Sequence, residues 1–248
     1  ERLVSERVDG ILTVSPEDQE ALRELGVRSP IQVIQNCLDV ARLPFQASPS
    51  ERDAAEIVFT GTMDYRPNVD AATWFCSEVW PRVLSRLPEA RFTIVGRDPS
   101  PAVRQLAQQH GVEVTGAVPD VGPFLRRATV YVVPMRMGGG VRFKVLEALA
   151  AGLPVVSTTM GATGVDLNPG VHALLADQPD EMASTIVRLI QRPEERLSMA
   201  KAGRELVAER FDWAVVIPVL EAFYVQLLEP PKIESNFPHP DEFRAAGK

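Results

Sequence analysis

One short stretch of the sequence gathers residue types that could bind an anion. Three glycines at 138–140 are followed by Arg142, Lys144 and Glu147. Glycine has no Cβ, so its backbone can bend freely and approach a ligand closely. A glycine loop that leads into a helix leaves free N–H groups and the positive end of the helix dipole pointing at one place. Two cations beside such a loop favour a phosphate group as its ligand.

A helix is expected directly after the glycine loop. From Val141 onward, apolar residues recur at helical spacing, and a glycine followed by a proline ends the pattern. The core-facing residues are Val145, Ala148 and Leu149, and the end is marked by Gly152 and Pro154. Residues 154–158, with the sequence PVVST, are expected to form a short buried strand.

Lys144 and Glu147 share one face of this helix with Gly140, because the three residues follow i, i+4, i+7 spacing. Two interpretations are open. The face binds a ligand, or Lys144 and Glu147 form a solvated ion pair that contributes about 0.2–0.5 kcal/mol. Arg142 lies in the first helical turn, where a cation opposes the helix dipole unless an anion is bound. Arg142 and the glycine loop therefore favour a ligand.

Other reactive side chains show no catalytic or metal-binding pattern. His110, His172 and His239 are scattered, without an i, i+4 pair or a cysteine partner, so no metal site is expected. The hydroxyl groups at 157–159 lack the G-x-S-x-G elbow of a serine nucleophile. We expect both groups of residues to be structural or solvated.

Composition and charge exclude several classes of protein. The 248 residues carry a net charge of −7 and are 45% hydrophobic, which indicates a soluble globular chain without a broad nucleic-acid interface. Cys37 and Cys76 lie far apart without metal-ligand spacing, which favours a reducing compartment. No run approaches the ~20 apolar residues of a membrane span, and the charged start differs from a signal peptide. We expect a cytoplasmic location, and the first residue, Glu1, is compatible with a fragment.

From Glu56 onward, apolar strands alternate with amphipathic helices, which predicts an α/β fold with a parallel sheet covered on both faces. Strands are expected at 10–15, 31–36, 56–61, 92–96, 112–116, 129–134, 154–158 and 172–176, and helices at 16–25, 102–110, 121–127 and 213–228 and from residues 68, 141, 180 and 193. Ligands of such sheets bind beyond the carboxyl ends of the strands. The loops of interest therefore follow Gly61, Gly96, Gly116, Pro134 and Ser157.

Four segments, in their order along the chain, resemble the C-terminal half of GT-B fold glycosyltransferases, specifically the large retaining family 4. They are FTGTMDYRPNVDAATWF, FTIVG, VEVTGAVPDV and VYVVPMRMGGGVRFKVLEALAAGLPVVST. The resemblance covers roughly residues 5–228 and is most specific in LEALAAGLPVVST with the glycine loop before it. It implies a Rossmann-like domain that holds a nucleotide sugar. Glu147 matches the family's ribose-binding glutamate, and Gly139 and Gly140 match glycines that lie against the diphosphate or the sugar.

Two departures from the family pattern concern charged residues. The family carries another glutamate eight positions before the ribose-binding one, and that position is Gly139 here. The family also commonly places an arginine after the strand-end glycine and a lysine slightly later. Here Thr62 follows Gly61, and Arg66 is the nearby cation.

We expect Arg142 and Lys144 to replace the missing cations and to stabilise the leaving diphosphate without a metal ion or other cofactor. This arrangement fits a branch that resembles polysaccharide and exopolysaccharide sugar transferases. The expected substrate-binding residues are Gly61, Thr62, Arg66, Gly96, Arg97, Val118, Gly138, Gly139, Gly140, Val141 and Glu147.

The resemblance also implies a division of the chain. Residues 1–44 correspond to the end of an N-terminal GT-B domain and the crossing, 45–212 to the nucleotide-sugar-binding domain, 213–228 to a helix that packs back toward the first domain, and 229–248 to a tail. The implied activity is retaining transfer of a hexose from a nucleoside diphosphate sugar to a glycan or lipid-linked acceptor. It would be weak without the missing N-terminal domain, through which the protein could attach to the inner face of the membrane. A non-catalytic nucleotide-sugar-binding or partner-binding module and a GT-B nucleotide-sugar epimerase stay open as alternatives.

Overall fold

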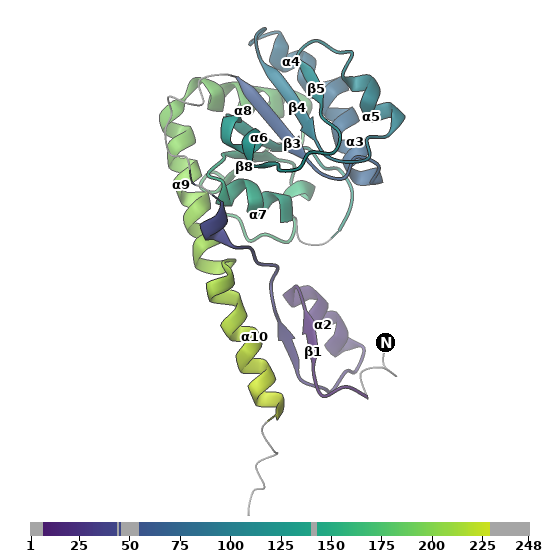
Figure 1. Ribbon diagram of the computed structural model, residues 1–248, viewed down its shortest axis with the longest axis vertical. Coiled ribbons are helices and arrows are strands. Elements are labelled where there is room, and N and C mark those ends of the chain that lie inside the picture. Colours follow the sequence, from purple (N-terminus) through teal and green to yellow (C-terminus); the bar gives the residue numbers. More distant parts are fainter. Residues whose placement is uncertain (1–6, 44, 46–54, 140–142, 229–248) are drawn as a thin grey trace, which may run out of the picture.

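A six-stranded parallel sheet forms the centre of the computed structural model, which describes residues 7–43, 45, 55–139 and 143–228. The strands lie in the order β5-β4-β3-β6-β7-β8 (Figure 1). Their bounds are β3 Glu56–Thr60, β4 Arg91–Val95, β5 Val112–Val114, β6 Val130–Val133, β7 Val155–Ser157 and β8 Ala173–Leu175. The chain adds strands to one side of β3 and then continues on the other side with β6. The switch point of the sheet therefore lies between β3 and β6.

Helices cover both faces of this sheet, so the predicted Rossmann-like α/β fold is confirmed. One face carries α3 (Arg66–Trp74), the π-helical segment η3 (Phe75–Val79), α4 (Trp80–Leu84), α5 (Pro101–Leu106) and α8 (Pro179–Gln191). The other face carries α6 (Gly122–Arg127) and α7 (Phe143–Ala150), and α9 (Pro193–Arg210) packs against α7.

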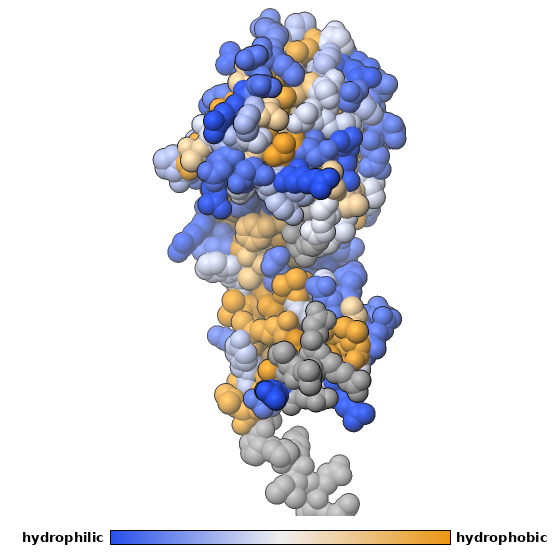
Figure 2. All heavy atoms as spheres, turned by 90° about the vertical axis from the view of Figure 1, so that its right-hand side faces the viewer, coloured by the Kyte–Doolittle hydropathy of each residue, from blue (hydrophilic) through white to orange (hydrophobic). Residues whose placement is uncertain are grey.

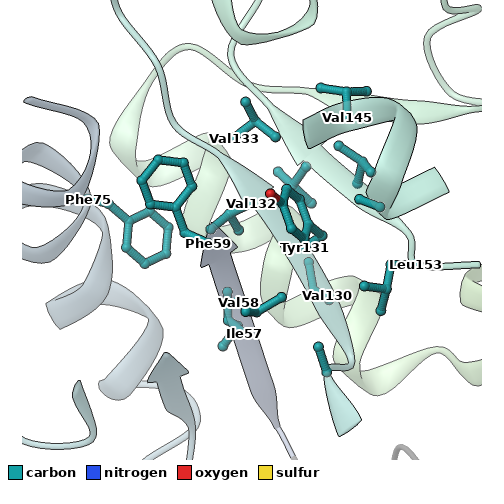
Figure 3. Packing of buried hydrophobic residues seen from close by; sticks show 14 of the residues in the cluster. Ile57, Val58, Phe59, Phe75, Val130, Tyr131, Val132, Val133, Val145 and Leu153 are labelled. Atoms are coloured by element: carbon teal, nitrogen blue, oxygen red, sulfur yellow. The ribbon is translucent and has the colours of Figure 1, made fainter. Parts of the chain in front are cut away.

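The core on the α3 side is rich in aromatic residues. Phe75 packs against Phe92 with ring centroids 4.4 Å apart, and Trp80 lies 5.9 Å from Phe92. Figure 3 shows Phe59 of β3 beside Phe75, with Tyr131 of β6 on the side of Val145. Complete burial of such a side chain stabilises the fold by about 1.5–3 kcal/mol. This packing fixes the ends of β3 and β6, where the candidate site lies.

Some elements are shorter than the sequence pattern predicts. The helix expected at 102–110 ends at Leu106, and Gly111 makes the following turn with φ 73°. The expected helix from Val141 is described from Phe143, because Gly140, Val141 and Arg142 lie outside the described residues. The strands expected at 10–15 and 31–36 are reduced to β1 (Ile11–Thr13) and β2 (Ile31–Val33). Apolar runs mark where a strand lies but not where its ladder of hydrogen bonds ends.

The strands β1 and β2 form a separate two-stranded parallel sheet, joined by α2 (Pro16–Glu24). Ser15 caps α2, and its hydroxyl accepts a hydrogen bond from the Asp18 N–H at 3.1 Å. This small unit lies beside α10 (Trp213–Leu228) in Figure 1. A Cβ on Gly10 would lie 2.7 Å from Leu227 Cδ1, so the two elements are in close contact.

The segment that leads from the small unit to the six-stranded sheet is held by one arginine. Arg204 of α9 donates hydrogen bonds to the carbonyl groups of Val40 and Leu43, each at 2.8 Å. The same guanidinium group donates to the carbonyl of Ala150 at the end of α7. Burial lowers the pKa of Arg204. Through Arg204, both the crossing segment at Val40 and Leu43 and the end of α7 are hydrogen-bonded to α9.

The surface of α10 and the small unit is unusually apolar. Figure 2 shows apolar side chains gathered over this part of the molecule, next to the more polar surface of the sheet region. The exposed apolar residues include Val8, Leu12, Val14, Trp213, Ile217, Tyr224, Val225 and Leu228. Within the described part of the chain, no helix has the length and apolar character needed to cross a membrane.

Candidate functional site

The carboxyl ends of β3 and β4 meet at two glycines. Gly61 donates a hydrogen bond from its N–H to the Val95 carbonyl at 3.0 Å, and Met63 donates to the Arg97 carbonyl at 2.8 Å. A Cβ on Gly96 would lie only 1.6 Å from the Gly61 carbonyl oxygen. Gly96 is thus required by the close approach of two backbones. The two predicted site glycines, Gly61 and Gly96, therefore lie side by side at the carboxyl ends of β3 and β4.

Lys144 crosses the switch point from α7 to reach the end of β3. Its Nζ donates hydrogen bonds to the Thr60 carbonyl at 2.8 Å and to Asn68 Oδ1 at 2.7 Å. The Nζ also lies 4.4 Å from the centroid of the Phe59 ring. A Cβ on Gly61 would be 3.0 Å from this nitrogen. The ammonium group is therefore fixed beside Gly61 and is half-buried, which disagrees with the interpretation of Lys144 as one half of a solvated surface pair.

Asn68 is a member of this cluster that the sequence analysis did not identify. Its side chain is 5% exposed, and its Nδ2 donates to the Thr62 carbonyl at 2.9 Å. The sequence predicts a helix that begins near Asn68, where asparagine is a common cap. In the structure α3 begins at Arg66, and Asn68 is its third residue. Only its spatial partners distinguish it from a cap, and one of them, Lys144, is 76 residues away along the chain.

Glu147 lies on the same face of α7 as Lys144, as the spacing predicts. Burial raises the pKa of the Glu147 carboxyl, and the nearby charge of Lys144 opposes this rise. Beneath it, the Tyr131 hydroxyl and the Thr60 hydroxyl share a buried hydrogen bond of 2.6 Å. Burial raises the pKa of Tyr131, and the charge of Glu147 adds to the rise. A half-buried carboxylate beside an ammonium group can accept hydrogen bonds from a ligand's hydroxyl groups.

An open pocket of about 560 Å³ lies beyond the ends of β3 and β4. It brings together three of the predicted residues, Thr62, Arg66 and Arg97, with Asn68. The side chains of Arg66 and Arg97 are exposed. Asp64, Tyr65 and Asp98 complete the lining. The pocket therefore offers arginine, aspartate and amide side chains to a ligand beyond the ends of β3 and β4.

The remaining predicted residues lie around this centre. Val118 follows β5, is half-buried and packs against the core, and it does not line the pocket described above. Gly138 has φ 103°, a conformation that favours glycine. Gly139 is exposed, and a Cβ there would meet no heavy atom within 4 Å. Gly140, Val141 and Arg142 lie outside the described residues, so their predicted roles stay predictions.

An arginine anchors the loop that precedes the glycines. Arg136 donates to both carboxylate oxygens of Asp70 on α3, at 3.1 and 2.5 Å. Its guanidinium group also lies over the Trp74 ring, 5.4 Å from the centroid. This ion pair joins the loop after β6 to α3 across the switch point. Among the described residues, no cluster of three or more His, Cys, Asp or Glu side chains could hold a metal ion.

The doubly wound parallel sheet matches the fold of GT-B glycosyltransferases. The chain belongs to the family described as glycosyl transferases group 1, whose model matches residues 54–192, more than half of its length.

Curated relatives agree with this assignment. The chain is 26% identical over 230 residues to the glycogen synthase of Mycobacterium tuberculosis, covering 88% of the chain and 54% of the relative. It is 27% identical over 183 residues to the phosphatidyl-myo-inositol mannosyltransferase of the same species, covering 70% of the chain and 47% of the relative. The chain thus spans about half the length of these relatives.

Solved structures share the fold. The Anabaena protein Alr3699/HepE in complex with UDP matches with a TM-score of 0.70 and 17% identity, covering 91% of this chain and 65% of that one. The pneumococcal O-GlcNAc transferase GtfA in complex with UDP and GlcNAc matches with a TM-score of 0.71 and 15% identity, covering 92% and 47%.

Proposed function

We propose that this chain is the donor-binding half of a glycosyltransferase that moves a hexose, with retention, from a nucleoside diphosphate sugar to a glycan or lipid-linked acceptor. The observation that carries the proposal is the half-buried ammonium group of Lys144, held beside Gly61 at the switch point of the sheet. A fixed cation at this place is suited to a diphosphate. The UDP bound to Alr3699/HepE and the UDP and GlcNAc bound to GtfA support the same choice of ligand.

In this proposal Lys144 stabilises the charge that develops on the leaving diphosphate. Its hydrogen bonds to Thr60 and Asn68 hold the nitrogen in place before the reaction, so little reorganisation is needed when the charge appears. Arg142 is proposed from the sequence as a second cation for the same group. Under this proposal the charge is stabilised by side chains and backbone N–H groups without a metal ion or cofactor.

Other residues would hold the rest of the donor. Glu147 would accept hydrogen bonds from the ribose hydroxyl groups, and the backbone near Gly96 and Val118 would hold the base. Arg66 and Arg97 both line the pocket and would add favourable charge for an anionic ligand.

We also propose that an acceptor domain corresponds to the half of the relatives that this chain does not match. The parallel sheet of β1 and β2 has two strands of three residues each, whereas parallel sheets are normally larger and buried on both faces. The exposed apolar residues of the small unit and of α10 surround it, among them Leu12 and Trp213. A further domain that extends this sheet would cover them.

The proposal is tested by thermal unfolding with a panel of nucleosides, nucleoside diphosphates and nucleotide sugars. A ligand that binds the native state at a hundred times its Kd adds about 2.7 kcal/mol to the free energy of unfolding. We expect one nucleoside diphosphate to raise the Tm, and Lys144→Met to reduce that rise. Lys201→Met, at an exposed position of α9, is the control and should leave the rise unchanged. If no nucleotide raises the Tm, the proposal is wrong.

A second candidate is a nucleotide-sugar-binding module without transferase activity. The observation that favours it is Gly139, which provides no carboxylate where the family carries one. A donor-hydrolysis and transfer assay on a chain that includes the acceptor domain separates the two. Transfer of the sugar supports the enzyme, and donor binding without any turnover supports the module. A product sugar inverted at one carbon, without transfer, would instead indicate an epimerase.

A further inference from the structure

Asn68 has a buried amide side chain, and the proposed function uses only its contact with Lys144. Only 5% of the residue is exposed, in the first turn of α3. A buried amide is tolerated when its polar atoms are paired, and here both ends are. The two partners belong to different elements, α7 and the loop after β3. Asn68 therefore connects parts of the chain that meet only at the switch point.

The chemistry of the partners fixes which way the amide points. Lys144 Nζ can only donate a hydrogen bond, so the atom 2.7 Å from it must be the amide oxygen. The Thr62 carbonyl can only accept, so the atom 2.9 Å from it must be the amide nitrogen. Reversing the amide would leave both contacts repulsive. Asn68 thus holds the ammonium group on one side and the backbone of Thr62 on the other.

Gly61 lies against this pair. A Cβ there would be 2.6 Å from Asn68 Nδ2 and 3.0 Å from Lys144 Nζ. The backbone at Gly61 therefore comes as close to the two side chains as a residue without a side chain allows. Lysine has a flexible four-carbon stem, so its nitrogen has no fixed place unless neighbouring acceptors define one. Thr60 and Asn68 supply two such acceptors.

We infer that Asn68 is a positioning residue that fixes the ammonium group of Lys144 and the Thr62 backbone on either side of Gly61, so that both face the diphosphate of the donor. The inference rests on the proposed function, in which Lys144 contacts the diphosphate.

The neutral amide matters for this role. An aspartate at position 68 could also accept a hydrogen bond from Lys144, but its negative charge would offset the charge of the ammonium group. It would also place a second acceptor against the Thr62 carbonyl, since a carboxylate has no N–H to donate. Asparagine holds the lysine without neutralising it. The two substitutions Asn68→Ala and Asn68→Asp therefore disturb the same role in two different ways.

The test is a double-mutant cycle on the whole 248-residue chain. Binding of UDP and of uridine is measured by calorimetry for the parent, Asn68→Ala, Lys144→Met and the double variant. GDP and guanosine replace them if the thermal panel selects GDP. We expect Asn68→Ala to weaken UDP binding about tenfold, the effect of 1.4 kcal/mol, and to leave uridine binding unchanged. With Lys144→Met already present, Asn68→Ala should have a smaller effect on UDP, because only its contact with Thr62 is then left to lose.

Two further variants separate positioning from folding. Asn168→Ala, at an exposed loop position, is the matched control and should leave UDP binding unchanged. Asn68→Asp keeps the size of the side chain and takes the place of Asn68→Ala in the cycle if the latter does not fold. It should also weaken UDP but not uridine binding, and by less when methionine replaces Lys144.

The outcomes separate the inference from the function on which it rests. The inference is overturned if the position 68 variants weaken UDP and uridine equally, or if their effect is as large with methionine at position 144. In either case the donor-binding function still stands, because Lys144→Met alone weakens UDP binding. If Lys144→Met leaves UDP binding unchanged, the proposed role of Lys144 fails and the inference fails with it.

Discussion

Replacing Gly96 by alanine should separate the ends of β3 and β4. The added Cβ would lie 1.6 Å from the Gly61 carbonyl oxygen, and an ordinary contact begins at 3.4 Å, so the two backbones must part by about 1.8 Å. The hydrogen bonds from Gly61 to Val95 and from Met63 to Arg97, now 3.0 and 2.8 Å long, would not survive that movement.

The expected loss follows from these contacts. Each hydrogen bond contributes about 1 kcal/mol net. Overpacking of a tight contact adds about 1–3 kcal/mol. We therefore expect Gly96→Ala to lower the free energy of unfolding by about 3–5 kcal/mol, which in a chain of this size lowers the Tm by about 6–20 °C.

Thermal unfolding followed by circular dichroism measures this effect directly. The control is Gly139→Ala, because a Cβ at that exposed position meets no heavy atom within 4 Å and should leave the Tm unchanged. Binding of UDP to Gly96→Ala should also weaken, since Gly61 and Thr62 move with the strand end. A Tm within about 1 °C of the parent, far below the shift that these contacts imply, would refute the close approach of the two backbones.

Three further predictions concern the same region. Glu147→Gln should weaken UDP binding without loss of stability, because the raised pKa of Glu147 means that its charged form is disfavoured in the folded chain. The folded chain therefore loses stability as the pH rises from the ordinary value of 4.5 through the raised pKa, and unfolding measured against pH should show that Glu147→Gln removes this loss. Tyr131→Phe should lower the free energy of unfolding by about 1–3 kcal/mol, measured by urea denaturation, because the buried Thr60 hydroxyl loses its 2.6 Å partner. Gly139→Glu should keep the Tm of the parent, since the position has space for a side chain, and should raise affinity for UDP-glucose relative to UDP in calorimetry; a fall in Tm would contradict the open geometry of this loop.

The strands of the sheet could be predicted because each is marked by the hydrophobicity of a few consecutive residues. Val130–Val133 is an unbroken hydrophobic run and β7 begins with two valines, the pattern of parallel strands buried on both faces. The strand-end glycines Gly61 and Gly96 follow such runs directly, so their position at the ligand edge also followed from the sequence.

The arrangement of polar groups was harder to predict because it depends on distant partners. The spacing of Lys144 and Glu147 identifies their common face, but it cannot show that Lys144 reaches Thr60 and Asn68 on other elements. Asn68 was missed since asparagine at a helix start is more often a cap than a buried link. The hydrogen bond between Tyr131 and Thr60 joins two strands whose neighbourhood is set only by the strand order.

The contact of Arg204 with Ala150 has an electrostatic consequence for α7. The last carbonyl groups of a helix carry the negative end of its dipole, and a guanidinium group bonded there is favourable. The opposite end of α7 follows the glycine loop, so the helix has a cation at its negative end and the proposed anion at its positive end. The same guanidinium group also donates to the Val40 and Leu43 carbonyls, so one side chain binds both the crossing segment and the end of α7. Arg204 thus joins the crossing segment to the helix that carries Lys144 and Glu147.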